Sequence, residues 1–199
     1  MSEQISSVPT PPVETPTAPG LQHPNMLRDI IETMVLVAIA FLVVNALIGR
    51  FRIEQVSMLP NLHEGEYVIV DKISYALRQP ERGEIVVLKN PTPGQPDLIK
   101  RLIGLPGETI DVHDGKVYVN GQPLAEPYLA QPMAGDSTAT QLQAGQYFVM
   151  GDNRNNSEDS RRFGPRPLND IVGRAWIIYW PPADWQILAR PTYAALAAP

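Results

Sequence analysis

Residues 98–108 have the sequence Leu98-Ile99-Lys100-Arg101-Leu102-Ile103-Gly104-Leu105-Pro106-Gly107-Glu108. This stretch places a single lysine in a run of mostly apolar residues. On a strand, successive side chains point to opposite faces, so Arg101 would point away from Lys100. A lysine taken out of water loses its proton more readily, because desolvation disfavours the charged form. Lys100 is therefore a candidate general base, and an exposed strand lysine is the plain alternative.

A serine that Lys100 could deprotonate lies about forty residues earlier, in the segment Ser57-Met58-Leu59-Pro60. A neutral lysine amine can accept the proton of a serine hydroxyl, so this pair can do nucleophilic chemistry without histidine. The histidines at 23, 63 and 113 are scattered and show no metal-ligand spacing. The chain also lacks the Gly-x-Ser-x-Gly pattern of one common histidine-based triad. The residues thus favour a serine–lysine pair.

Three segments, in order, resemble the signatures of type I signal peptidases, the membrane-bound enzymes that remove secretory signal peptides. Residues 57–62 resemble the family's serine segment, and residues 100–108 resemble its lysine segment. Residues 151–161 resemble the third signature, with the sequence Gly151-Asp152-Asn153-Arg154-Asn155-Asn156-Ser157-Glu158-Asp159-Ser160-Arg161. The resemblance covers roughly residues 27–182. The two ends of the chain are similar to those of cyanobacterial and plastid-type members.

The resemblance implies a role for each matching residue. Ser57 would be the nucleophile and Lys100 the general base, in an endopeptidase that cuts after a small residue. Ser157 would form a hydrogen bond to Lys100, and Asp159 and Arg161 would form an ion pair that holds the loop. The substrate would arrive as an extended strand that pairs with the edges near residues 53–56 and 97–99. The substrate-binding candidates are Ile53, Val56, Met58, Leu98 and Ile99.

Two positions depart from the family pattern. Gln55 stands where many members carry a serine or threonine that helps to hold the oxyanion. The donors would then be the Ser57 backbone N–H with a side-chain amide, or the backbone alone, and losing one such donor costs about a hundredfold or more in rate. Asn61 stands where threonine is usual, and either residue can make short polar contacts with the backbone.

The composition limits the other functional classes. The chain has 199 residues, no cysteine and a formal net charge of −5. This length suggests one main domain. The absence of cysteine excludes disulfides, thiolate zinc sites and a cysteine nucleophile, and the negative charge argues against a general nucleic-acid binder. We expect no metal or organic cofactor, and the resemblance implies signal peptides and membrane lipid as partners.

Sequence patterns divide the chain into four parts. Residues 1–25 contain six prolines and predict a disordered tail. Residues 26–49 are predicted to form a transmembrane anchor, because no charge occurs from Thr33 to Gly49 and those 17 residues reach the lower limit for a bilayer span. A buried soluble helix is the alternative. Residues 50–190 would form the catalytic domain, and residues 191–199 a C-terminal tail.

The charges flanking the predicted span disagree with the family topology. Arg28 precedes the span, whereas Arg50 and Arg52 follow it, which weakly favours a domain inside the cytoplasm. The resemblance implies a single-pass protein whose catalytic domain lies on the outer face, periplasmic or lumenal. We follow the resemblance, because long domains translocate largely regardless of such counts.

Beyond residue 52 the pattern predicts a mainly β domain of the signal-peptidase type. Strands are expected at residues 67–70, 84–88, 146–150 and 174–180, with a hairpin around 114–121 and a short helix within 71–79. Residues 109–146 would hold the hairpin and an insertion, of which 122–145 are predicted as a loop. The aromatic residues Trp176, Tyr179, Trp180 and Trp185 could pack in the core or form a membrane-facing belt.

Two other functions remain possible at this stage. One is a self-cleaving repressor of the LexA type, which also uses a serine–lysine pair. Such a repressor needs a DNA-binding segment before the serine, where this chain has a proline-rich tail and an apolar segment. The other is a membrane-anchored β module that binds peptides without cutting them, and only Gln55 favours it.

Overall fold

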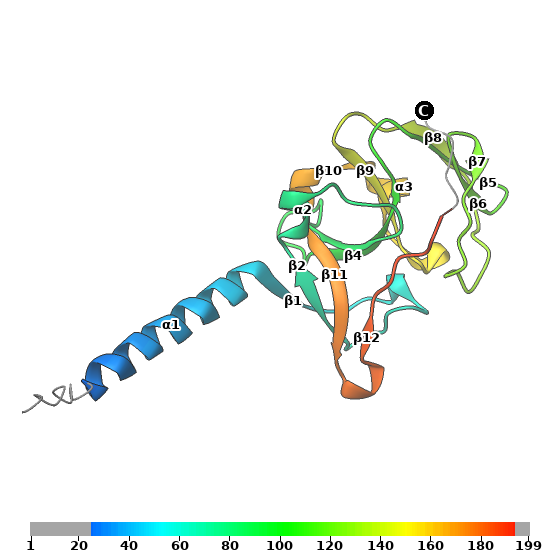
Figure 1. Ribbon diagram of the computed structural model, residues 1–199. Coiled ribbons are helices and arrows are strands. Elements are labelled where there is room, and N and C mark those ends of the chain that lie inside the picture. The colour runs from blue at the N-terminus through cyan, green and yellow to red at the C-terminus, as the bar shows by residue number, and fades with distance from the viewer. Residues whose placement is uncertain (1–24, 194–199) are drawn as a thin grey trace, which may run out of the picture. The chain divides into compact units, whose positions relative to one another are not determined.

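The computed structural model describes residues 25–193 (Figure 1). The tail predicted for residues 1–25 lies almost entirely outside the described residues, as does most of the predicted tail at 191–199. The chain divides into two units, with the boundary between Ala40 and Phe41. The second unit contains all the strands.

Helix α1, Met26–Leu47, forms in the region predicted as the anchor. Its apolar side chains are exposed to solvent, as Leu36 and Phe41 illustrate at 67 % and 65 %. Within residues 25–193, no helix has both the length and the apolarity needed for a membrane crossing. The transmembrane character predicted for residues 26–49 is therefore not confirmed.

The main sheet is antiparallel and has eight strands. Its order is β1-β2-β11-β3-β4-β9-β10, and β12 pairs with β11. The strands are β1 Ile48–Arg52, β2 Tyr67–Asp71, β3 Ile85–Leu88, β4 Leu98–Gly104, β9 Gln146–Met150, β10 Arg166–Pro167, β11 Ile171–Trp180 and β12 Gln186–Ile187. All four strands predicted by the sequence are present, and the predicted short helix is α2, Ser74–Leu77.

The short helices of the second unit lie in the connections between strands. Helix η1 precedes β2, and two helices, η2 and α3, follow β9. Their bounds are η1 Val56–Met58, η2 Arg154–Asn156, α3 Ser160–Phe163, η3 Leu168–Asp170 and η4 Pro182–Asp184.

Strand β4 is buried along its whole length, which explains how a lysine on it can be kept from water. It lies between β3 and β9 in the main sheet. Leu98 and Leu102, two residues either side of Lys100, pack in one hydrophobic cluster, whereas Ile99 and Ile103 belong to two others. Apolar side chains therefore cover both faces of the strand.

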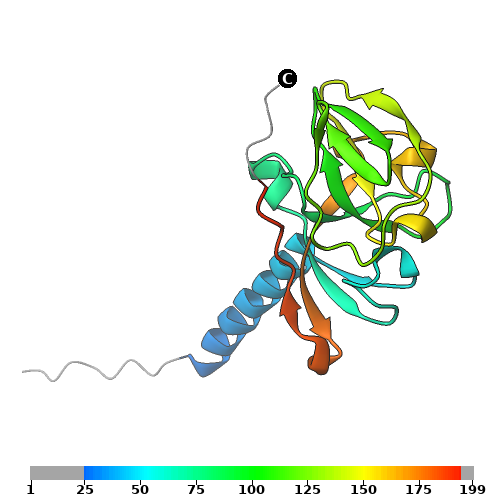
Figure 2. The same cartoon turned by 90° about the vertical axis from the view of Figure 1, so that its right-hand side faces the viewer.

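A second, four-stranded sheet is formed within residues 109–141 (Figure 2). Its order is β7-β6-β5-β8, with β5 Thr109–His113, β6 Lys116–Val119, β7 Gln122–Pro123 and β8 Ser137–Gln141. The predicted hairpin is β5–β6, and its turn residues Asp114 and Gly115 have φ of 50° and 69°, as a tight two-residue turn requires.

The prediction of a loop over residues 122–145 is wrong in part, because β7 and β8 lie within it. Strand β8 has the polar sequence Ser-Thr-Ala-Thr-Gln and forms an edge that pairs only with β5 among the described strands. Such a strand lacks the apolar alternation by which a half-buried strand is recognised. Strand β8 therefore forms because it pairs with β5, and its own sequence pattern does not predict it.

The tryptophans near the end of the chain are not core residues. Trp176 and Trp180 on β11 are 42 % and 53 % exposed, and Trp185 beyond η4 is 70 % exposed. The core-packing interpretation of these three side chains is therefore wrong. Tyr179 is half-buried and lies against Tyr67, with ring centroids 6.0 Å apart.

Candidate active site

Ser57 and Lys100 meet in the folded protein. Lys100 Nζ lies 2.8 Å from Ser57 Oγ, in hydrogen-bond contact. Ser57 belongs to η1 and Lys100 to β4, and both are buried, at 4 % and 1 % exposure. The interpretation of Lys100 as an exposed strand lysine is therefore wrong.

Burial changes the acidity of Lys100. Desolvation lowers its pKa to about 8, against the opposing effect of the carboxylates of Asp159, Glu158 and Asp152. Near neutral pH a substantial minority of such lysines are therefore neutral, whereas an ordinary lysine is almost wholly protonated. A neutral amine at this distance can take the serine proton directly.

The loop after β9 holds the nucleophile in place. The Asn153 backbone N–H donates to the Ser57 carbonyl at 2.9 Å, and its side-chain amide donates to the Val56 carbonyl at 3.1 Å. Gly151 allows this approach, because a Cβ there would lie 2.5 Å from the Ser57 carbonyl oxygen and 2.3 Å from Ser157 Oγ. A larger residue at 151 would push the loop away from Ser57.

Arg101 anchors the same loop from the next position of β4. Its guanidinium donates to both carboxylate oxygens of Asp152, at 2.8 and 2.6 Å, and to the Gly83 carbonyl at 2.9 Å. Asn61 also donates to Asp152, at 2.8 Å. The side-chain amide of Asn61, which stands where the family usually has threonine, therefore contacts the loop that holds Ser57.

Two further ion pairs hold the loop. Arg161 pairs with Asp159 at 2.8 Å, as the sequence predicts, and Asp159 also accepts the Gly151 N–H at 3.0 Å. Although burial alone would raise the pKa of Asp159, hydrogen bonds and charge from Arg161 lower it. Arg154 pairs with Glu126 of the insertion, a partner 28 residues away that no sequence pattern indicated.

Ser157 is near the dyad but does not form its predicted hydrogen bond. Its Oγ is buried and has no hydrogen-bond partner of ordinary geometry, although it is close enough to Asp159 to help lower the pKa of that carboxyl. The hydrogen bond from Ser157 to Lys100 expected from the family is absent, and the described contact of Lys100 Nζ is with Ser57 Oγ. Ser157 nevertheless lines the same pocket as Ser57.

Two adjoining pockets surround the nucleophile. The Ser57 pocket, of about 430 Å³, is lined by residues 54–57, 155–158 and 162. The edge pocket, of about 190 Å³, lies between residues 50–55 and 96–99. Glu54 and Gln55 line both. Strand β9 pairs with β4 only from Arg101 onward, so this edge of β4 is free at residues 98–100 among the described strands.

The substrate-binding candidates fall into two groups. Val56, 38 % exposed, lines the Ser57 pocket, and Ile99 lines the edge pocket. Ile53, Met58 and Leu98 are core residues, with exposures of 0 %, 0 % and 6 %. Ile53 and Met58 pack in one hydrophobic cluster and Leu98 packs in another, so their side chains face other apolar side chains. Only their backbone could contact a substrate.

Gln55 is exposed and precedes η1. Its side chain does not cap the helix, and it lines both pockets. Ser57 lies in the first turn of η1, where backbone N–H groups have no partner within the helix. The two predicted oxyanion donors therefore lie on one short segment. Within residues 25–193, no group of three or more His, Cys, Asp or Glu side chains could hold a metal ion.

The fold and site define a β-rich protein with a buried serine–lysine pair at an interior strand of its main sheet. Comparison with known families gives the more particular assignment. The family described as "Signal peptidase, peptidase S26" matches residues 27–180, and the chain belongs to this family.

Several curated relatives are similar over most of the chain. A signal peptidase I of Leptolyngbya laminosa is 39 % identical, covering 90 % of this chain and 93 % of the relative. A probable signal peptidase I-2 of Synechocystis sp. is 42 % identical, covering 79 % and 75 %. Thylakoidal processing peptidase 1 of Arabidopsis thaliana is 36 % identical, covering 74 % of this chain and 46 % of that protein. The predicted likeness to cyanobacterial and plastid-type members is confirmed.

Among solved structures, a signal peptidase I from Enterococcus faecalis is 36 % identical to this chain. The match covers 49 % of this chain and 97 % of that one, with a TM-score of 0.45.

Proposed function

We propose that this chain is a serine endopeptidase that removes N-terminal signal peptides from exported preproteins, with Ser57 as nucleophile and Lys100 as general base. The observation that carries the proposal is the 2.8 Å contact between Lys100 Nζ and Ser57 Oγ in a buried setting. The curated relatives, which are named signal peptidase I, support the same reaction.

The geometry supports a two-stage reaction. Neutral Lys100 takes the Ser57 proton as Oγ attacks the substrate carbonyl carbon, and the resulting ammonium then protonates the leaving amine. Lys100 next takes a proton from a water molecule, which attacks the acyl-enzyme ester. As the ester bond to Ser57 Oγ breaks and the signal peptide leaves, Lys100 returns that proton to Oγ. Every proton in this cycle passes through Nζ, so no metal or organic cofactor is needed.

The developing oxyanion needs donors close to Ser57. The Ser57 backbone N–H is one, since it lies in the first turn of η1. We assign the second position to the Gln55 side-chain amide, because Gln55 is exposed, makes no capping bond and lines the Ser57 pocket. Ser157, Asp159 and Arg161 would support the loop that faces this position.

The substrate would lie as an extended strand in the edge pocket, with its scissile carbonyl in the Ser57 pocket. The free edge of β4 at residues 98–100 supplies unpaired backbone groups for such a strand. Residues 53–56 form the opposite wall. Backbone pairing does not distinguish one side chain from another, so the pockets would select the small residues. This agrees with the Ala-x-Ala pattern at the ends of signal peptides.

The same proposal places the enzyme at a membrane, as a single-pass protein whose catalytic domain lies on the outer face. The exposed apolar side chains of α1 support attachment to lipid. Independently, Trp176, Trp180 and Trp185 are exposed in the second unit, and tryptophan favours the headgroup layer of a bilayer. Membrane lipid would thus be a partner of both units.

The test is cleavage of a presecretory protein by the full chain in detergent. Wild type should release the signal peptide after a small residue, and Ser57→Ala and Lys100→Ala should each lose activity while remaining folded by circular dichroism. Binding of a signal peptide without cleavage would favour the non-catalytic peptide-binding module. Cleavage of the chain itself, and not of the preprotein, would favour the self-cleaving class.

A further inference from the structure

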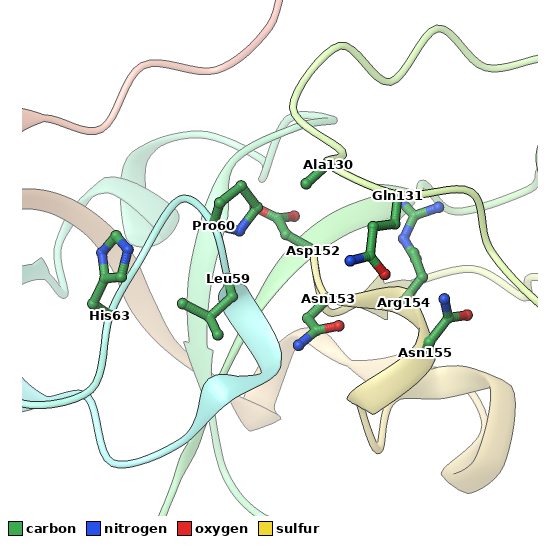
Figure 3. A pocket seen from close by; sticks show the side chains of 9 residues that line it. All are labelled: Leu59, Pro60, His63, Ala130, Gln131, Asp152, Asn153, Arg154 and Asn155. Atoms are coloured by element: carbon green, nitrogen blue, oxygen red, sulfur yellow. The ribbon is translucent and has the colours of Figure 1, made fainter.

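A third pocket adjoins the Ser57 pocket, with which it shares Asn155. This pocket, which we call the loop pocket, has a volume of about 260 Å³ and contains Leu59, Pro60, Ala130, Gln131, Asn153 and Asn155 in its lining. Figure 3 shows Ala130 and Gln131, from the insertion, facing the side of the pocket that Leu59 and Pro60 form. Its volume suits one or two amino-acid side chains.

Shared lining residues place the three pockets in a row. The edge pocket and the Ser57 pocket share Glu54 and Gln55, whereas the Ser57 pocket and the loop pocket share Asn155. In addition, Leu59 follows Ser57 by only two residues. A peptide whose residues before the cut occupy the edge pocket would therefore carry its residues after the cut toward the loop pocket.

The titratable side chains of the lining all have partners of opposite charge or hydrogen-bond partners, and His63 contacts Glu66 at 3.3 Å. Asp152 is paired with Arg101, and Arg154 with Glu126, so neither offers an unpaired charge to a ligand. The amide of Asn153 is engaged by the Val56 carbonyl. Gln131, by contrast, makes no hydrogen bond within residues 25–193 and is exposed, so its amide is available to a peptide backbone. The pocket therefore suits an uncharged side chain.

The wall formed by the insertion is held rigidly. Asn155 donates to the Pro132 carbonyl at 3.1 Å and accepts the Ala134 N–H at 2.7 Å, so it ties both sides of this turn to the catalytic loop. Asn61 donates to the Tyr128 carbonyl at 3.0 Å. Ala130 lies between these two attachment points, and its position relative to Ser57 is thereby set.

We propose that the loop pocket binds an uncharged side chain from one of the first two residues of the mature protein. Ala130, through its small size, would set how large that side chain can be. This inference rests on the proposed function, since it concerns the part of the preprotein that follows the cut. Residues of the insertion would thus contribute to substrate selection.

The test uses one preprotein with a fixed signal peptide whose first or second mature residue is Ala, Leu or Phe. Wild type, Ala130→Leu and Ala130→Trp are compared by kcat/KM on each substrate. Filling the pocket should lower kcat/KM for Leu and Phe, relative to Ala, by about tenfold or more, in the range that steric discrimination in a pocket provides. The effect should be greater for Trp than for Leu at position 130.

The matched control is Ala139→Trp, which puts the same side chain on an exposed position of β8 that does not line the loop pocket. It should leave the preference unchanged. A second substrate set varies the last residue of the signal peptide, and the Ala130 variants should keep the wild-type order on it. Melting temperatures show whether each variant is folded.

The outcomes separate this inference from the proposed function. If wild type cuts no preprotein, the proposed function fails. If wild type cuts but both Ala130 variants treat every mature residue as wild type does, the loop pocket is not a subsite. A changed preference for signal-peptide residues, with none for mature residues, would show that the peptide runs in the opposite direction and would overturn the inference.

Discussion

At the scale of single residues, Lys100 combines complete burial with a titration close to physiological pH. Desolvation lowers its pKa to about 8. For a general base that must be neutral, kcat/KM should therefore rise with pH and level off above a midpoint near that value, because this parameter reports the free enzyme. A histidine base would give a midpoint near about 6.5. The measurement is a pH series of kcat/KM on one preprotein.

Two histidine variants serve as controls for that profile. His113→Ala should keep both the activity and the midpoint, and His63→Ala, whose side chain lines the loop pocket, should keep the midpoint, since neither histidine lines the Ser57 pocket. Loss of the rising limb in either variant would contradict the assignment of Lys100 as the base.

The burial that activates Lys100 should also cost stability. Its folded-state pKa lies below the unfolded value of 10.5, so between about pH 8 and 10.5 the unfolded chain binds more protons and stability rises with pH. Below pH 8 the full destabilisation that comes from burying the charged lysine remains. Lys100→Met should therefore be inactive yet more stable than wild type at pH 7, by on the order of 3 kcal/mol from the size of the shift.

The measurement for Lys100→Met is urea unfolding at several pH values. The advantage of the variant over wild type should be constant below pH 8 and shrink as the pH rises toward 10.5. Ser57→Ala is the control, because it removes the contact with Lys100 and leaves the lysine buried. If Lys100→Met is less stable than wild type at pH 7, neighbouring groups fully offset the cost of desolvating the ammonium, and the prediction is wrong.

At the scale of elements, the connection after β9 carries most of the support for the dyad. Gly151→Ala should lower kcat/KM by about a hundredfold or more, since displacements near 1 Å have effects of that size. The added Cβ would lie far inside van der Waals contact with the Ser57 carbonyl and Ser157 Oγ. Steady-state kinetics and thermal melting of the variant check this.

Gly173→Ala is the matched control for Gly151→Ala. Its Cβ would lie 2.4 Å from the Asp71 carbonyl oxygen, a similar clash that disturbs the pairing of β2 with β11 away from the dyad. This variant should lose melting temperature and keep the wild-type kcat in its folded fraction. Full activity in Gly151→Ala would mean that the loop can relax without moving Ser57.

Sequence reasoning succeeded where a local pattern carried the information. The apolar run around Lys100, together with the serine segment and the third signature, favoured Lys100 as the base, and the Asp114-Gly115 turn indicated the β5–β6 hairpin. It failed where contacts between distant segments decide the structure. The polar strand β8 exists through its pairing with β5, and the Arg154–Glu126 pair joins segments that no spacing rule connects. Strand order likewise depends on long-range pairing.

The substrate-binding candidates near the site show the same limit of sequence analysis. Alternation on a strand gives two faces but does not say which face a neighbouring element covers. Ile53 and Met58 are substrate-binding candidates through the family resemblance, yet the side chains of both belong to the hydrophobic core. Ile99 belongs to that core as well, yet it also lines the edge pocket, so a single side chain can serve both purposes.

At the scale of the whole molecule, the proposed topology gives a direct test. The domain after Arg52 should be protected from added protease in sealed cells and digested in spheroplasts, if it faces the periplasm. The flanking charges, Arg28 before α1 and Arg50 and Arg52 after its end, favour the reverse. Immunoblotting of the domain, with a known cytoplasmic protein as control, distinguishes the two. Digestion only after the inner membrane is broken would contradict the outer-face location.

The second sheet has a further consequence that follows from its connectivity. Its four strands come from one uninterrupted stretch and, among the described strands, pair only with one another. The second sheet can therefore be lengthened, shortened or exchanged as one unit during evolution, while the strands of the main sheet and the dyad stay intact. A graft needs to keep the polar contacts of Asn61, Arg154 and Asn155 on the host side. It also needs to keep the apolar cluster that joins the second sheet to Ile103, Phe148 and Met150 of the main sheet. Chimeras between relatives offer a practical way to retune such a protein for new cargo while retaining its chemistry.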